Sequence, residues 1–555
     1  MNDHSIPAVA AVPDHIVVVG AGPAGCSAAL LLADAGVPVT LLERHPAPHP
    51  LPRAVHLDDE VTRILHALGI SEDFLARSKP ASGLRLLDAK HRVMADFRRQ
   101  QQIGRHGFPQ ANMFHQPDLE ELLLARVDRH PLIDLRRGLE VVEVEQSAHP
   151  GAAEPVRVVA ERADGTGTQT FTGRFALGCD GANSTVRDLV GIPMADLGFT
   201  ERWLVVDIRA SRDLQTWDGV EQICDPARAA TFMHVTRDWY RWEFQLRAGE
   251  DEADLTTHHV LARLLQPWTR QPDLASLEVV RSAVYTFRAR LASTFQSGRV
   301  FLLGDAAHLT PPFIGQGLGA GLRDADNLSW KIANVLTGRA DPSLLDSYDA
   351  ERRPHATTMV KRAVAIGWAM TGGQDRAAFV RRVALTVACR STTFREALAS
   401  PSTPRLKAGA LQKPERGARR PRDLRVGGLI GNPVVTTLDG ASSRLDDVLR
   451  RRTAVLTGRR PEPGLVDLCR QNGLQLIRVV PGEGHPADTV SDDEVQVAVA
   501  GAEASGLAAL LADPALAVVV RPDRVMASVA RRPQLPPLPW AARAVPVPSP
   551  LEATV

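Results

Sequence analysis

The sequence lacks the cysteine pattern of a disulfide framework or of a metal site. Its 555 residues include five cysteines, an odd number, and no two of them form a CxxC pair. Disulfide scaffolds, zinc sites and thiol redox sites depend on paired, closely spaced cysteines. We therefore expect a protein of a reducing cytoplasm that has no metal site.

Excess charge and long apolar runs are also missing. Lys and Arg number 65, Asp and Glu number 64, and the net charge is +1. A nearly neutral chain offers no field that would recruit nucleic acid or an anionic membrane. No uninterrupted apolar run reaches the roughly 18 residues of a membrane span, and no signal-peptide pattern is present. We expect no nucleic-acid partner and no membrane partner.

What the sequence does contain is a succession of strand and helix patterns that change in texture along the chain. Residues 14–190 alternate strands and helices, whereas closely spaced β-type runs fill residues 191–295. The alternating style returns over 296–400. Residues 401–426 are rich in Pro, Arg and Lys and are expected to form a linker, and residues 427–555 carry the strands and helices of a small separate α/β unit.

The first motif is a dinucleotide-binding fingerprint at residues 15–25. An apolar strand leads into Gly20, Gly22 and Gly25, a helix follows, and a second strand ends at Glu43. In such a unit the glycines allow a tight turn, close approach of a diphosphate and tight helix packing. The helix N-terminus faces the phosphates, and the acid binds ribose hydroxyls. The fingerprint alone does not separate FAD from NAD.

Two further motifs place an aspartate beside glycine at the end of an apolar strand. Residues 175–187 contain Asp180 and Gly181, and residues 299–326 contain Gly304 and Asp305. Such an acid can accept hydrogen bonds from sugar hydroxyls, and the glycines let backbone amides reach a ring or a phosphate. Either motif by itself is also compatible with a capped strand-to-helix turn.

Together and in this order the three motifs resemble the group A flavoprotein aromatic hydroxylases, the para-hydroxybenzoate hydroxylase family, over roughly residues 14–390. Residues 52–60 and 221–246 look most like the 3-(3-hydroxyphenyl)propionate hydroxylases of that family. The resemblance implies an α/β fold: a Rossmann-like FAD-binding domain with an inserted antiparallel-sheet substrate domain. It also implies a C-terminal thioredoxin-like domain, here without CxxC.

The resemblance assigns FAD contacts to residues that match the family motifs. These are Gly20, Gly22, Ala24, Gly25, Glu43, Arg44, Arg53, Gln116, Asp180, Gly181, Asp305, Gly315, Gly317, Leu318 and Gly319. Asp305 would bind the ribityl chain, and the backbone at Leu318 and Gly319 would hold the pyrimidine edge of the flavin. Arg53 would lie in the segment that follows the moving flavin.

The chemistry that the resemblance implies belongs to the cofactor. NAD(P)H reduces FAD, dioxygen adds at flavin C4a, and an electron-rich carbon of a phenol attacks the hydroperoxide, so hydroxylation falls ortho or para to a hydroxyl. Arg53, His56 and Pro312 are the predicted catalytic positions. The Pro312 carbonyl would face the substrate hydroxyl. His56 has the intrinsic pKa of a base, but a surface or structural histidine is the favoured interpretation, and Asp118 is the second candidate for the base.

Substrate contacts are the least determined part of the site. Asp118, His234 and Trp242 are candidates, against a helix N-terminal acid for Asp118 and a plain core face for Trp242. A carboxylate on the substrate would require an arginine, and neither Arg228 nor Arg241 can be chosen. A small phenol and dioxygen are the expected partners, and a homodimer is compatible with the resemblance. The absence of a basic cluster after Arg44 favours NADH.

Rival interpretations share the fold. An oxidase, a C=C reductase or a hydroxylase of an aromatic polyketide would carry the same FAD motifs, so the substrate rests on analogy. A halogenase is disfavoured because its lysine and tryptophan-rich signature is missing. A non-catalytic FAD-binding scaffold is the alternative of another class.

We predict that NADH reduces the flavin slowly in the absence of a phenol. Only one complete strand-GxGxxG-helix unit is present in the sequence, so the nicotinamide must dock transiently and meet a flavin that moves when substrate binds. Rapid mixing with NADH, with and without a phenol, measures the two rates of flavin bleaching. Equal rates would reject substrate gating, and Arg53→Ala should lower the stimulated rate while FAD stays bound.

Overall fold

The computed structural model describes most of the chain. The described residues are 14–48, 53–99, 103–146, 154–270, 274, 277–371, 403–407, 411, 424–437, 440–482, 494–499, 507–513 and 515–530. Most of the predicted linker 401–426, and residues 372–400 of the second α/β segment, lie outside this set. Among the helices of the described residues, none combines the length and apolar composition that a membrane crossing needs.

The first layer is a six-stranded sheet with a buried parallel centre. β1 (Ile16–Val19) is buried along its whole length, as expected for a parallel strand that is covered on both faces. The strands follow the order β18 (Gln296–Ser297), β19 (Val300–Leu302), β12 (Phe175–Gly178), β1, β2 (Val39–Glu43) and β8 (Ile133–Arg137). The strand, helix and second strand of the fingerprint are thereby confirmed, with α1 (Pro23–Ala33) as the helix.

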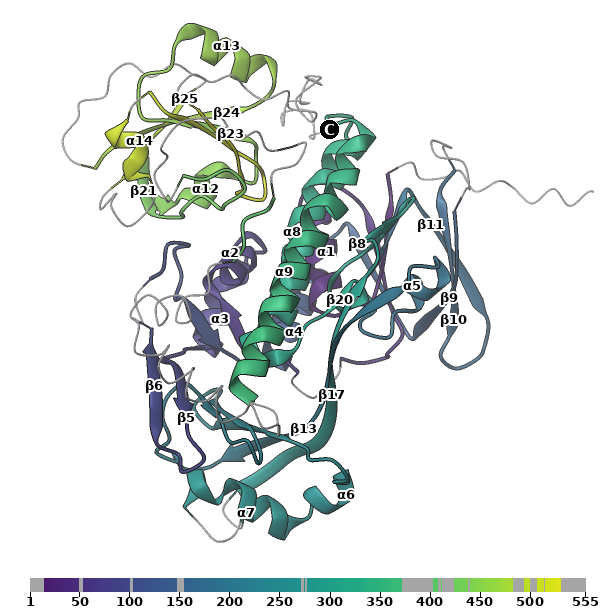
Figure 1. The fold of residues 1–555 in the computed structure, drawn as a ribbon. Coiled ribbons are helices and arrows are strands. Elements are labelled where there is room, and N and C mark those ends of the chain that lie inside the picture. The colour runs from purple at the N-terminus through teal and green to yellow at the C-terminus, as the bar shows by residue number, and fades with distance from the viewer. Residues whose placement is uncertain are drawn as a thin grey trace, which may run out of the picture.

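Two long helices lie across this sheet and run down the centre of the molecule (Figure 1). α8 (Gly317–Leu336) packs against α1, and α9 (Asp346–Thr371) packs against α8. α8 is buried almost continuously from Gly319 to Ala333, although it carries several charged side chains. Those charges are paired, which is the usual condition for burying them.

The β-rich insert forms most of an eight-stranded sheet. Its strands follow the order β20 (His308–Leu309), β17 (Leu277–Ala292), β13 (Met194–Ala210), β16 (Trp239–Gln245), β15 (Ala230–His234), β14 (Val220–Ile223), β5 (Gly83–Leu87) and β6 (Val93–Arg98). All neighbours are antiparallel except β14 and β5, which are parallel. The sheet of the predicted antiparallel insert therefore also contains β5 and β6 of the first α/β segment. Local periodicity cannot indicate this, because β5 pairs with β14, which lies far along the chain.

The two faces of this sheet have different partners. Leu204, Val206 and Ile208 pack in one core with α7 (His258–Thr269), which lies below the sheet in Figure 1. Trp203 and Asp207 alternate with these residues and point to the opposite face of the sheet. On that face the ring of Trp203 meets the ring of Phe313. Strand parity therefore decides which side chains of β13 face Phe313.

The C-terminal unit is a mixed sheet with helices of its own. Its strands follow the order β22 (Ser442–Arg444), β21 (Val434–Thr437), β25 (Glu494–Val499), β24 (Gln475–Pro481), β23 (Ala454–Thr457), β26 (Ala517–Val520) and β27 (Met526–Ala530). β23 and β24 are parallel and are joined by α13 (Pro463–Gln471), whereas β26 runs antiparallel to β23, and β27 runs antiparallel to β26. The predicted strands and helix of this unit are present.

Buried ion pairs join the C-terminal unit to the rest of the chain. Arg521 and Asp523 bond to each other, and Arg521 also donates to Glu351 of α9. Arg63 of α2 (Asp59–Ala67) donates two hydrogen bonds to Asp446, at 2.6 and 2.5 Å. Breaking a pair of this kind leaves one buried charge uncompensated, at a cost of roughly 3–5 kcal/mol. The unit is therefore docked in a defined orientation.

We predict that Cys469→Ser leaves the expected hydroxylase turnover intact. Cys469 lies in α13, is 2% exposed and packs in an apolar cluster with Trp330 of α8, and burial raises the pKa of its thiol to about 11. Its role is packing, so the buried hydroxyl should lower the free energy of unfolding by roughly 1–3 kcal/mol. Thermal unfolding and steady-state turnover measure the two effects, and a large loss of turnover in a folded variant would contradict the prediction.

Candidate functional site

The sequence motifs meet along one edge of the six-stranded sheet. β19, β12, β1 and β2 are neighbours and run parallel, so their carboxyl ends lie side by side. Asp305 follows the first of these strands, Asp180 the second and Gly20 the third, and Glu43 ends the fourth. Ligands of open α/β sheets bind outside this edge. The structure thus brings together groups that are far apart in the sequence.

The three fingerprint glycines have different surroundings. Gly20 has a φ of +101°, and a Cβ there would lie 2.5 Å from the carbonyl oxygen of Cys179. A Cβ on Gly25 would lie 1.9 Å from the carbonyl oxygen of Gly20. Around Gly22, by contrast, no atom lies within 4 Å of that position. Gly20 and Gly25 are therefore required by packing, and Gly22 faces open space at the N-terminus of α1.

Ala24 and Glu43 complete the first turn of this edge. The methyl of Ala24 packs at 3.4 Å from the position of a Cβ on Gly304, where α1 crosses the third motif. Glu43 accepts hydrogen bonds from the amides of Ala21 at 2.8 Å and His45 at 2.9 Å, so the glycine loop itself holds the carboxylate at the edge. Arg44 is exposed beside it.

The two aspartates behave differently. The side chain of Asp305 is exposed to solvent at this edge of the sheet. The surrounding protein still desolvates its carboxyl and raises its pKa, and the charges of His308 and Arg53 oppose that rise. Asp180 instead accepts from the Ser184 hydroxyl and from the Val186 amide, and so caps α5 (Thr185–Leu189). The capped-turn interpretation thus describes Asp180, with Gly181 at a φ of +84° beside it. The acid that faces solvent is Asp305.

The turn before α8 provides open backbone. Gly315 has a φ of +60° and closes the short helix η2 (Pro312–Ile314), with its amide bonded to the Pro312 carbonyl at 2.8 Å. Gly317 and Leu318 begin α8, and no atom lies within 4 Å of a Cβ placed on Gly317. Gly319 faces inward, because its Cβ would lie 2.8 Å from Arg323. The first amides of α8 therefore border unfilled space.

Residues 53–56, here called the Arg53 segment, are clamped from two sides. The side-chain oxygen of Gln116 accepts from the amides of Arg53 and Ala54, at 2.9 and 2.6 Å. Arg241 of β16 donates to the Arg53 carbonyl at 2.7 Å. Gln116, which the sequence predicted to contact flavin, is thus bonded to the backbone of this segment. Arg241 was not assigned to this region from the sequence, and only the sheet register could have revealed it.

His56 lies against Gly315 and beside Arg99. Its Nε2 is 3.3 Å from a guanidinium nitrogen of Arg99. Burial lowers the pKa of His56 to about 4, and the Arg99 charge contributes to the shift. The imidazole is therefore neutral at pH 7 and a weak proton acceptor. The packing supports the structural interpretation of this histidine.

The predicted substrate residues are spread over the insert and α4 (Gln116–Asp128). Asp118 pairs with His115 at 3.0 Å at the start of that helix. His234 stacks on Tyr240 and lies near Lys79 and Asp218. Trp242 is fully buried in the core against α7, which is the alternative that the sequence left open. These three side chains do not converge on one point.

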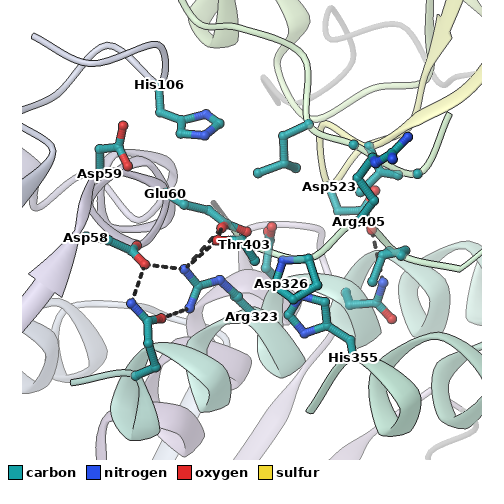
Figure 2. Close-up of a pocket in the computed structure, with 18 of the residues that line it drawn as sticks. Asp58, Asp59, Glu60, His106, Arg323, Asp326, His355, Thr403, Arg405 and Asp523 are labelled. Atoms are coloured by element: carbon teal, nitrogen blue, oxygen red, sulfur yellow. Dashed lines mark hydrogen bonds and ion pairs between the residues drawn. The ribbon is translucent and has the colours of Figure 1, made fainter. Parts of the chain in front are cut away.

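A charged cavity of about 1140 Å³ lies beside this region, between α2, α8 and the C-terminal unit (Figure 2). Its wall is built by Asp58, which accepts from Gln316 at 2.9 Å and from Arg323 at 2.5 Å, and by Glu60, which pairs with the same arginine. Asp58 is the second residue after the Arg53 segment, and Arg323 lies on α8. The cluster therefore ties that segment to the helix whose first turn borders the open space.

Comparison with known proteins identifies relatives over both parts of the chain. Residues 14–363 match the family model described as "FAD binding domain", and residues 427–544 match the "HcaD C-terminal domain". The chain is 33% identical over 435 residues to the 3-(3-hydroxy-phenyl)propionate/3-hydroxycinnamic acid hydroxylase 2 of Burkholderia vietnamiensis. That match covers 78% of this chain and 77% of the relative.

Two further matches span different substrates. A Rhodococcus jostii protein named "Probable NADH-specific resorcinol 4-hydroxylase" is 34% identical over 375 residues, or 68% of this chain and 69% of the relative. The solved structure of the OxyS anhydrotetracycline hydroxylase from Streptomyces rimosus aligns with a TM-score of 0.71 at 25% identity. It covers 93% of this chain and 95% of that chain.

We predict opposite outcomes for two glycine variants. Gly22→Val should fold normally but bind FAD at least about tenfold more weakly, because its side chain enters the open space where a diphosphate would lie. Gly20→Val should fail to fold stably, since its Cβ meets the Cys179 carbonyl at a positive φ. Flavin content and thermal unfolding measure both effects, and full FAD occupancy in Gly22→Val would remove Gly22 from the site.

Proposed function

Because the chain belongs to the FAD binding domain family, whose model matches residues 14–363, we propose that it is an FAD-dependent aromatic hydroxylase that uses NAD(P)H and dioxygen. The observation that carries the proposal is the sheet edge. The Glu43 carboxylate, open backbone at Gly22 and the solvent-facing acid Asp305 follow strands of this edge, and open backbone at Gly317 begins α8.

FAD would supply the redox chemistry, taking electrons from NAD(P)H and activating dioxygen. The chain's own residues bind and orient. Gly20, Gly22 and Glu43 would hold the adenosine and diphosphate end, Asp305 the ribityl chain, and the backbone of Leu318 and Gly319 the pyrimidine edge of the ring. The Pro312 carbonyl, which already accepts from Gly315, keeps one lone pair for a substrate hydroxyl.

The Arg53 segment would border the reacting ring, and it is the part of the site best suited to movement. Its Arg53 and Ala54 amides donate to Gln116, the carbonyl of Arg53 accepts from Arg241, and the carbonyl of Val55 accepts from the Phe114 amide, while the Arg53 side chain itself is exposed. A segment held by a few bonds at its backbone can shift as a unit while its ends stay anchored. Substrate binding at the sheet face can therefore be sensed by this segment.

The nicotinamide co-substrate is proposed to be NADH. The chain has no basic cluster after Arg44, and a relative at 34% identity is named NADH-specific. The nicotinamide is proposed to dock near residues 180–187, and this region has a structural role as well. Arg187 donates to the carbonyls of Ala182 and Ala306 and so connects the second motif to the third. Removing its side chain would disturb the FAD edge itself.

The substrate is proposed to be a single-ring phenol. The relatives at 33% and 34% identity are named for hydroxyphenylpropionate and resorcinol, whereas the tetracycline-type hydroxylase is 25% identical. Of the two arginines considered for a substrate carboxylate, Arg228 is paired with Glu250 and Arg241 with Asp207. Neither is available without giving up its present acid. A hydroxylase of a polyketide remains the second candidate because the fold is shared.

The C-terminal unit is proposed to be thioredoxin-like in fold and structural in role. Support comes from the strand order, in which parallel β23 and β24 are followed by antiparallel β26 and β27 at the other side of β23. The unit contains Cys469 as a single cysteine and no CxxC, so thiol exchange is not available to it. Its buried ion pairs with α2 and α9 favour bracing of the FAD-binding part.

We predict that 3-(3-hydroxyphenyl)propionate and resorcinol stimulate NADH oxidation by the FAD-loaded protein. Each should yield a product heavier by one oxygen atom, hydroxylated ortho or para to the existing hydroxyl, because phenolate donation enriches those carbons. Oxygen-consumption assays and product mass spectrometry test this over a panel of single-ring phenols and polyketides. NADH oxidation without oxygen insertion would indicate an oxidase or a reductase, and no oxidation with any phenol would favour the scaffold.

A further inference from the structure

Glu243 lies at the centre of the sheet face that looks toward the FAD-binding part. It pairs with Val205 of β13 and Thr231 of β15, so its side chain is on the face of Trp203 and Asp207. Its neighbours in the strand, Trp242 and Phe244, point into the core on the other side. Strand parity thus directs Glu243, and not its neighbours Trp242 and Phe244, to the proposed substrate region.

Both flanks of Glu243 touch the predicted catalytic segments. On one side Arg241, two residues earlier on β16, donates to the carbonyl of Arg53. On the other side Gln245, two residues later on β16, pairs with Trp203, whose ring lies 5.8 Å from the ring of Phe313 between centroids. Phe313 adjoins Pro312. Glu243 therefore faces the interval between the Arg53 segment and the turn that carries the Pro312 carbonyl.

The carboxylate of Glu243 has no hydrogen-bond donor among the described residues, although the side chain is only 7% exposed. The nearby guanidiniums bond to other groups, although the Nε of Arg281 has no partner among the described residues. Arg241 and Arg281 both bond to Asp207, at 2.7 and 2.6 Å, and Arg281 also donates to the Tyr285 hydroxyl at 2.8 Å. A buried carboxylate without a donor is costly for a fold. A ligand that donates a hydrogen bond would remove that cost.

We infer that Glu243 is the catalytic base that accepts the proton of the substrate's phenolic hydroxyl. The inference rests on the proposed function and names a residue for its proton transfer. The O–H bond of the phenol breaks, the proton joins a carboxylate oxygen of Glu243, and the electron pair stays on the phenolate oxygen, which enriches the ortho and para carbons. No electron is transferred in this step.

The electrostatics of the position suit a base. Burial raises the pKa of Glu243 and Asp207 raises it further, whereas the charges of Arg241 and Arg281 oppose the rise. Arg53 is the charged residue of the facing segment, and η2 presents uncharged side chains. A carboxylate with a raised pKa is a stronger proton acceptor than His56, whose pKa is about 4.

The test compares Glu243→Gln with the wild-type holoenzyme, using 3-(3-hydroxyphenyl)propionate as the phenol. The amide keeps the shape but cannot accept the proton, so hydroxylation should fall by roughly 10²-fold or more while FAD content is unchanged. Raising the pH toward the ordinary pKa of a phenol, about 10, should restore much of the rate. A more acidic halogenated phenol, already ionised at neutral pH, should lose far less.

Glu221→Gln is the matched control. Glu221 lies in the same sheet and burial also raises its pKa, but it faces the α7 side and accepts a hydrogen bond from Trp268 at 3.1 Å. It should keep the wild-type rate and pH profile. Glu243→Asp retains a carboxylate, so it should keep the wild-type form of the pH profile at a reduced rate, and it serves if the glutamine variant is unstable.

The outcomes separate the inference from the proposed function. A Glu243→Gln rate close to wild type, or equal losses in the Gln and Asp variants without any change of pH profile, would overturn the role of Glu243 while the hydroxylase assignment stands. Wild-type protein that oxygenates no phenol would overturn the proposed function and the inference with it. A loss confined to Glu243→Gln and recovered at high pH supports the base.

Discussion

The site depends on how the Arg53 segment is held between α4 and the eight-stranded sheet. Its amides donate to Gln116 on one side, and its carbonyl accepts from Arg241 on the other. Arg241 can reach it only because Asp207, fully buried on the neighbouring strand, fixes the guanidinium. The bonds involve backbone groups and a charge-assisted donor, so the geometry is defined without using the Arg53 side chain.

Backbone packing also defines the carboxyl edge of the six-stranded sheet. Gly20 and Gly25 are required because backbone atoms of neighbouring turns occupy the place of their side chains, and this packing brings β1 close to the turn that follows β12. Gly22 meets no such neighbour, which distinguishes a glycine that serves the fold from one that leaves room for a ligand. Asp180 and Asp305 differ in the same way, since the first caps its own helix and the second faces solvent.

The C-terminal unit is part of this arrangement through α2 and α8. Arg63 follows the Arg53 segment by less than three helical turns and is bound by Asp446, whereas Asp326 and Asn327 of α8 bond to Arg524 and Asp523. α2 and α8 are thus anchored by ion pairs and hydrogen bonds to the C-terminal unit. The anchoring is ionic and buried, which makes it orientation-specific.

Local patterns in the sequence were sufficient for the FAD fingerprint, the order of the α/β segments, the strands of the insert and the elements of the C-terminal unit. Each of these follows from short-range periodicity and from residues whose conformational needs are local, such as Gly20. Tertiary structure decided three other features: the pairing of β5 with β14, the bonding of Gln116 to the Arg53 segment and the core position of Trp242. It also decided the place of Glu243, which the sequence does not distinguish from any other acid. Which face of a strand is buried, and what lies opposite it, depends on register between segments far apart in the chain, and a one-residue shift would exchange Glu243 with Trp242.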